Sequence, residues 1–228
     1  MRSSARPMRR GPPLAVFDLD RTLLAGRTIL DLADRFGVLP EVQAIWDRHR
    51  AQELAAGEEE SRAIAALFAG VDEAALADAC EDRPLRAGAE ATVQGLRAMG
   101  FRVGVASATY TQATAAVARR LGLDFHVGAR LVVEDGRLTG ALAPSPASGA
   151  CGQHVCKEAV LLTERDRTGA SFTLAVGDGQ NDLCMFQAAD LAVAVEPCHP
   201  RLRAAAHAVV PELPDLLPIV AARLGRAA

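Results

Sequence analysis

The chain has 228 residues, of which half are hydrophobic and 4% aromatic, and its formal net charge is -3 at pH 7. This length suits one sizeable domain, or a core domain with a smaller insertion. The composition is that of a folded globular protein, and the charge disfavours nucleic acid or an anionic membrane as partner. No apolar run approaches the roughly 20 residues of a membrane helix, and no secretory signal pattern is evident. We therefore expect a cytoplasmic protein, and the sequence leaves its oligomeric state open.

The cysteines and the only lysine carry further information. Five cysteines at irregular spacing favour reduced thiols over a disulfide framework. Lys157 is the single lysine among 25 basic residues. A compact ammonium differs from a guanidinium in shape and hydration, so its retention indicates a contact with a group such as phosphate. Chance retention is the alternative interpretation.

The N-terminal part predicts a tail, a strand and a helical insertion. Residues 1–12 place arginines at 2, 6, 9 and 10 among serine, proline and glycine, which is typical of a flexible basic tail. Residues 14–17 form an apolar run that ends at Asp18, the pattern of a buried parallel strand. From 28 to 79 the apolar period is helical, and glycines divide it into about four helices. We expect a helical cap at 25–84 inserted into a core formed by 13–24 and 85–228.

The remaining elements alternate between helix and strand. Asp135-Gly136 lies between two short apolar runs, which is a strong hairpin signal. The other predicted elements are a helix at 89–99, a strand at 101–106 that ends at Ser107, a helix at 111–121, a loop at 144–152, a helix from about 154, and strands at 172–176, 191–195 and 208–210, with a final helix. This order predicts an α/β fold with a three-layer, doubly wound, mostly parallel sheet.

Polar residues stand at the expected strand ends in a fixed order. They are the run 18–22 with Asp18 and Asp20, then Ser107, then Lys157 at a helix start, and finally the run Gly-Asp-Gly-Gln-Asn-Asp at 177–182. Each alone is a weak signal, since strand-end carboxylates and glycine turns are common. In this order and spacing they resemble the four motifs of the haloacid dehalogenase superfamily, over essentially the whole chain after the tail. The helical insertion and the hairpin resemble its phosphoserine-phosphatase-like branch, which has a Rossmann-like core.

Chemistry explains why these residue types belong together. A carboxylate needs no separate base to act as a nucleophile, so Asp18 could attack phosphorus directly and form a phosphoaspartate. The resemblance implies that Asp20 protonates the leaving oxygen and then activates water. It also implies a magnesium ion held by Asp18, Asp178 and the backbone carbonyl of Asp20, an oxygen-only set that suits Mg²⁺.

Further residues are expected to bind the phosphoryl group or to support the metal. Ser107, with Ala108 beside it, and Lys157 would hold the phosphoryl oxygens. Asn181 would contact the phosphate side of the site. Asp182 would support the metal or Lys157 from outside the ligand shell.

The expected substrate is a small phosphomonoester. True phosphoserine phosphatases carry a glutamate for the substrate amine nine residues after the nucleophile, where this sequence has Arg27. The arginine that binds the substrate carboxylate in those enzymes aligns near Ile64, with Arg62 close by. Arg27 indicates an extra negative charge on the substrate. Phosphoserine hydrolysis proper, and phosphotransfer to an acceptor other than water, stay open as alternatives.

Two other functional hypotheses are alternatives to a phosphatase. A zinc site could be built from Cys151, His154 and Cys156 together with Cys198 and His199, although this spacing has no familiar two-pair form. A phosphorylatable regulatory module also uses aspartates, a lysine and magnesium, but such modules are shorter and have no helical insertion. Other residues are given structural roles. The histidines at 49, 126 and 207 are expected to be structural or on the surface, and Trp46 and Phe68 to lie in the core of the helical bundle.

Overall fold

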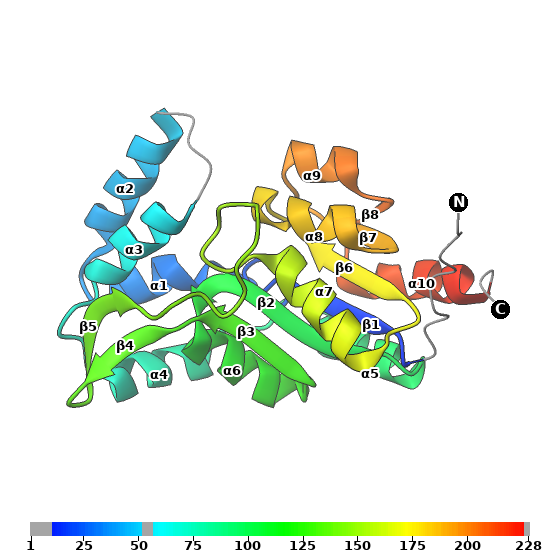
Figure 1. The fold of residues 1–228 in the computed structure, drawn as a ribbon, viewed down its shortest axis with the longest axis horizontal. Helices are drawn as coiled ribbons and strands as arrows, with labels where there is room; N and C mark the ends of the chain where they lie inside the picture. The colour runs from blue at the N-terminus through cyan, green and yellow to red at the C-terminus, as the bar shows by residue number, and fades with distance from the viewer. Residues whose placement is uncertain (1–10, 52–56, 226–228) are drawn as a thin grey trace, which may run out of the picture.

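The computed structural model describes residues 11–51 and 57–225; the arginines of the predicted tail lie outside these residues. Its centre is a six-stranded parallel sheet with the order β3-β2-β1-β6-β7-β8. The strands are β1 (Leu14–Phe17), β2 (Arg102–Tyr110), β3 (Phe125–Ala129), β6 (Thr173–Gly177), β7 (Leu191–Val195) and β8 (Ala208–Val210). Helices cover both faces, so the predicted doubly wound α/β class is confirmed (Figure 1).

The strand order reverses at β1, which pairs with β2 on one side and β6 on the other. Phe17 is in register with Val105 of β2 and with Val176 of β6. Asp18 therefore follows β1 at the edge of the sheet where Ser107 lies on β2 and Asp178 directly follows β6. In open α/β sheets, ligands bind at the carboxyl ends of the strands at such a switch point.

Core helices pack on the two faces of this sheet. α5 (Ala89–Ala98) and α10 (Leu216–Gly225) lie on one face, and α7 (Lys157–Thr168) and α8 (Leu183–Ala188) lie on the other (Figure 1). α6 (Thr111–Leu121) and α9 (Pro200–Ala205) complete the layers. All four residues of β1 are fully buried, as expected for a central parallel strand. None of the helices within the described ranges has the length and apolar character needed to cross a membrane.

Between β1 and α5 the described residues form a helical segment, α1–α4. It comprises α1 (Thr28–Arg35), α2 (Leu39–Ala51), α3 (Glu58–Ala66) and α4 (Glu73–Glu81). A hairpin of β4 (Leu131–Glu134) and β5 (Arg137–Leu142) extends from the core and contacts this segment. The Gly70 amide donates to Leu138 O at 2.7 Å, and the Leu138 amide donates to Val71 O at 2.8 Å. The hairpin therefore ties the helical segment to the core.

The backbone conformation of the turn explains why the sequence predicted this hairpin. Asp135 has φ 49° and Gly136 has φ 76°, so both turn residues occupy the left-handed region. Two-residue hairpin turns of this kind favour Asp-Gly, because glycine tolerates positive φ and aspartate is among the few other residues that do.

The structure differs from the sequence prediction at three places. β2 continues past the predicted end to Tyr110, so Ser107 lies within the strand. β3 was not predicted, because its exposed and half-buried positions give no continuous apolar run. α7 begins at Lys157, three residues after His154, because the backbone of Cys156 is extended and forms the N-cap.

Phe68 joins the helical segment to the core. Its ring is fully buried and makes edge-to-face contacts with Phe36 and with Tyr110 of β2, with ring centroids 6.3 and 5.6 Å apart. We predict that Phe68→Ala lowers the free energy of unfolding by about 3–5 kcal/mol. Denaturant titration measures this, with the half-buried neighbour Leu67→Ala as control. Equal losses in the two variants would contradict this role for Phe68.

Candidate active site

A cavity of about 870 Å³ lies where the helical segment faces the carboxyl ends of the strands. Its wall includes every residue that the sequence singled out for the site: Asp18, Asp20, Arg27, Ser107, Ala108, Lys157, Asp178, Asn181 and Asp182. The fold thus brings together groups that are separated by up to 164 positions, the interval from Asp18 to Asp182.

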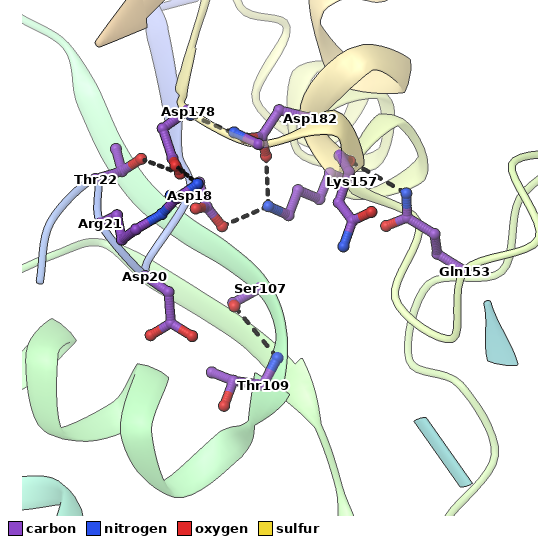
Figure 2. Close-up of polar contacts among 12 residues, drawn as sticks. Asp18, Asp20, Arg21, Thr22, Ser107, Thr109, Gln153, Lys157, Asp178 and Asp182 are labelled. Carbon is purple, nitrogen blue, oxygen red and sulfur yellow. Dashed lines mark hydrogen bonds and ion pairs between the residues drawn. The ribbon is translucent and has the colours of Figure 1, made fainter. Parts of the chain in front are cut away.

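Lys157 lies at the centre of the polar network (Figure 2). Its ammonium group donates to both Asp18 Oδ1 and Asp182 Oδ1, and its side chain is only 3% exposed. Burial alone would lower the pKa of Lys157, but the two carboxylates raise it above its ordinary value. The lysine therefore stays protonated and fixes one oxygen of Asp18.

Three buried carboxylates form one group. Asp18, Asp178 and Asp182 each offer an oxygen, and these atoms all lie within 4.8 Å of one another. Burial, together with the neighbouring carboxylates, raises the pKa of Asp178 above its usual range. An all-oxygen set with excess negative charge matches what Mg²⁺ binds in proteins. These residues therefore fit the expected metal.

Asp182 is oriented by the backbone around it. Its Oδ2 accepts hydrogen bonds from the amides of Asp178 and Gly179 at 3.1 and 2.9 Å. A side chain at Gly177 would place its Cβ 2.4 Å from the same oxygen, so glycine is required there. With Oδ1 bonded to Lys157, both oxygens of Asp182 already have partners.

Asp178 also has partners in the turn after β1. Arg21 forms an ion pair with Asp178, and Thr22 Oγ1 donates to Asp178 Oδ1 at 3.4 Å. Arg21 has φ 61°, a left-handed conformation that is uncommon for residues other than glycine and often marks a functional turn. No role was expected for Arg21 or Thr22, although both belong to the run after Asp18.

Asp20 is held apart from this cluster. Its carboxylate points away from Lys157 in Figure 2 and accepts hydrogen bonds from the amide, at 3.0 Å, and the hydroxyl of Thr28. Thr28 is the first residue of α1, so the carboxylate lies at the positive end of that helix. Burial, opposed by the Thr28 bonds and reinforced by Asp18, raises the pKa of Asp20 to about 6. Thr28 was not expected to take part in the site.

The side of the cavity where the sequence predicts phosphate binding is lined by the end of β2 and by the turn after β6. Ser107 is 4% exposed, and its Oγ accepts from the Thr109 amide at 3.2 Å. Asn181 belongs to a short 3₁₀ helix at Gln180–Asp182, and its backbone oxygen accepts from Gln153 Nε2 at 3.3 Å.

The helical segment supplies a second wall of the cavity. The Arg27 guanidinium lies 5.8 Å from the centre of the Trp46 ring, within the range of a cation–π contact. His49 lies 3.4 Å from Glu60, and all four residues line the cavity. His49 and Trp46 were expected to be structural. Helical periodicity alone does not reveal which face of the segment meets the cavity, so their position was missed.

The zinc site suggested by the sequence does not form with the predicted partners. Cys151 and Cys156 instead lie with Cys184, and within the described ranges neither His154 nor the pair Cys198 and His199 joins that group. The His199 amide donates to Asp178 O at 2.8 Å, so this residue lies beside the carboxylates.

Comparisons with known proteins agree with this geometry. The family model for haloacid dehalogenase-like hydrolases matches residues 15–187. The phosphoserine phosphatase SerB2 of Mycobacterium tuberculosis is 36% identical over 197 residues, which cover 86% of this chain and 46% of that protein. A phosphoserine phosphatase of Streptomyces coelicolor is 35% identical, over 89% of this chain and 48% of its own length. The chain thus spans about half the length of these two relatives.

A shorter relative and a solved structure match over most of their lengths. The phosphoserine phosphatase of Halobacterium salinarum is 37% identical over 81% of this chain and 86% of its own length. A phosphoserine phosphatase structure, described as a phospho-aspartyl intermediate analogue, superposes with a TM-score of 0.78 at 29% identity, covering 92% of this chain and 99% of the other. The motifs, the fold and these matches together place the chain in the haloacid dehalogenase-like hydrolase family.

Proposed function

We propose that the protein is a phosphatase that hydrolyses a small phosphomonoester through a phosphoaspartate on Asp18. The observation that carries this proposal is the buried pairing of Asp18 with Lys157, beside two further carboxylates at the switch point of the sheet. The relatives named above, which are phosphoserine phosphatases, support the same reaction class.

The reaction would proceed in two steps. An oxygen of the ionised Asp18 carboxylate attacks phosphorus, the bond from phosphorus to the ester oxygen breaks, and Asp20 gives its proton to the departing alkoxide. Asp20 then takes a proton from water as that water attacks phosphorus, which releases phosphate and regenerates Asp18. Lys157 and Ser107 stabilise the charge on the phosphoryl oxygens.

Magnesium would be held by Asp18 and Asp178, with the backbone carbonyl of Asp20, and oriented through Asp182. When bound, the ion would offset the repulsion between the carboxylates and the phosphate dianion and polarise the phosphoryl group. The fit rests on three buried carboxylates that have two cationic partners, the buried Lys157 and the partly exposed Arg21, so negative charge is in excess. The described hydrogen bonds of Asp182 support its role outside the ligand shell, since both of its oxygens are already engaged.

Asp20 is suited to give and take protons in turn. A carboxyl group with a pKa of about 6 is readily protonated and deprotonated near neutral pH. Because Thr28 belongs to α1, the helical segment that lines the cavity also orients this carboxylate.

The cavity wall indicates a substrate with charges beyond its phosphate. Arg27 suits an additional anionic group, and Glu60 is the acidic residue that the helical segment presents to the cavity. Such a pair suits a zwitterion, so phosphoserine is the first substrate to test, followed by other phosphorylated amino acids and small phosphomonoesters. Product analysis separates hydrolysis from phosphotransfer, and release of many phosphates per chain separates an enzyme from a regulatory module.

Replacing the nucleophile tests the core of the proposal. Asp18→Asn keeps the size of the side chain but removes the charge that attacks phosphorus, so we expect kcat to fall at least about 1000-fold. Phosphate release measures this, and circular dichroism checks the fold. Asp34→Asn, an exposed change on α1, serves as the matched control. An Asp18→Asn enzyme that keeps more than a tenth of the activity would refute the nucleophilic role.

Magnesium binding is testable without turnover. At a Mg²⁺ concentration about 100 times Kd, we expect the melting temperature to rise by about 5–10 °C. Asp178→Asn should abolish this increase because it removes a proposed ligand, whereas the Asp34→Asn control should keep it. A full Mg²⁺-dependent increase in Asp178→Asn would show that the ion binds elsewhere.

Arg27 is expected to act in substrate binding. Arg27→Ala should raise KM about tenfold and change kcat less than about twofold, because it removes a charge-assisted contact made in both the ground state and the transition state. Arg35→Ala, at an exposed arginine in the last turn of the helix that follows Arg27, is the control. Steady-state kinetics with the best substrate measure both constants. A fall in kcat at constant KM would contradict a role of Arg27 in substrate binding.

A further inference from the structure

Three thiols from two parts of the sequence lie close together. Cys151 lies in the loop before α7, Cys156 is the N-cap residue of α7, and Cys184 lies in the first turn of α8. Their sulfur atoms all lie within 4.8 Å of one another. Cys156 and Cys184 are buried, Cys151 is half-buried, and all three are free thiols.

This spacing is close to that of a metal–thiolate site. With Zn–S bonds of about 2.3 Å in tetrahedral geometry, neighbouring sulfurs lie about 3.8 Å apart. Small adjustments of three side chains, one of them on a loop, would reach that spacing. Sulfur ligands select soft or borderline cations and disfavour Mg²⁺, so this cluster and the carboxylates would hold different ions.

We propose that Cys151, Cys156 and Cys184 form a second metal site, which binds a thiophilic cation of the Zn²⁺ class. Each thiol that coordinates the ion releases its proton to solvent. The other cysteines, Cys80 and Cys198, lie outside the cluster.

The backbone of the loop packs closely against the cluster. A Cβ on Gly149 would lie 2.2 Å from Cys156 Sγ, so the backbone at this glycine closely approaches the sulfur. Burial raises the pKa of the Cys151 thiol to about 12, so it is neutral near pH 7 and a poor nucleophile. The close approach at Gly149 and the neutral thiol both disfavour a reactive cysteine, and a cation that binds these sulfurs would displace their protons.

The site adjoins the catalytic machinery through the backbone. Cys156 precedes Lys157, and Cys184 is two residues from Asp182. Gly152 O accepts from the Glu58 amide at the start of α3 at 3.0 Å, and Gln153 reaches Asn181 O. A cation bound to the three sulfurs would therefore link the loop to α7 and α8. It would thereby stabilise the positions of Lys157, Asp182 and the start of α3.

The test uses the full-length protein, purified under reducing conditions and stripped with chelator. With Mg²⁺ in excess to occupy the carboxylates, Zn²⁺ is titrated against a chromophoric chelator. We expect one tightly held equivalent in the wild type, its loss in Cys151→Ser and in Cys184→Ser, and its retention in the matched control Cys198→Ser. Weak or absent binding by the wild type, or full retention in Cys184→Ser, would overturn the proposal.

A second measurement avoids reliance on the variants. Co²⁺ added to the stripped wild-type protein should give intense near-ultraviolet absorption from thiolate-to-cobalt charge transfer, which carboxylate ligands do not produce. Bound Co²⁺ without this absorption would contradict the sulfur site even if the serine variants fail to fold. Neither readout uses phosphatase activity, so the outcome is independent of the proposed reaction.

Discussion

The site depends on a buried ammonium group held between two buried carboxylates. The side chains of Lys157, Asp18 and Asp182 are 3%, 9% and 1% exposed, so none is well hydrated. Leaving one charge of such a network without its partner typically costs about 3–5 kcal/mol. With Asp178 added, three carboxylates face two cationic groups, the Lys157 ammonium and the Arg21 guanidinium, and the remaining negative charge favours binding of a further cation. The same excess explains why a phosphate dianion would approach Asp18 only once that charge is balanced.

The second constraint is the position of β1, at which the strand order of the sheet reverses. Placing β1 between β2 and β6 brings Asp18, Ser107 and Asp178 to one edge of the sheet. The helical segment then returns over this edge, and Thr28 at the start of α1 holds the Asp20 carboxylate. The proposed nucleophile and the proposed acid are thus fixed by different parts of the fold. Movement of the helical segment would change the position of the Asp20 carboxylate but would leave the pairing of Asp18 and Lys157 intact.

Much of this arrangement could be predicted from the sequence, and the failures have physical causes. β1 and β7 are continuous buried runs, and the hairpin turn carries residues that tolerate positive φ, so local pattern was sufficient. β3 lies at the sheet edge with exposed positions, which hides its strand character. Cys184 joins Cys151 and Cys156 only through the packing of α8 near α7, and residue spacing contains no sign of that contact. The partnership of Asp20 with Thr28 was missed for a similar reason.

The proposed reaction requires Asp18 to carry the phosphoryl group during turnover. Borohydride reduces an acyl phosphate to an alcohol, so quenching the reacting enzyme with borohydride converts a phosphorylated aspartate to homoserine. Peptide mass spectrometry after such a quench should find homoserine at position 18, only when substrate and Mg²⁺ are present. Reduction at another carboxylate such as Asp178, or turnover with no reduced residue in rapidly quenched samples, would contradict the account.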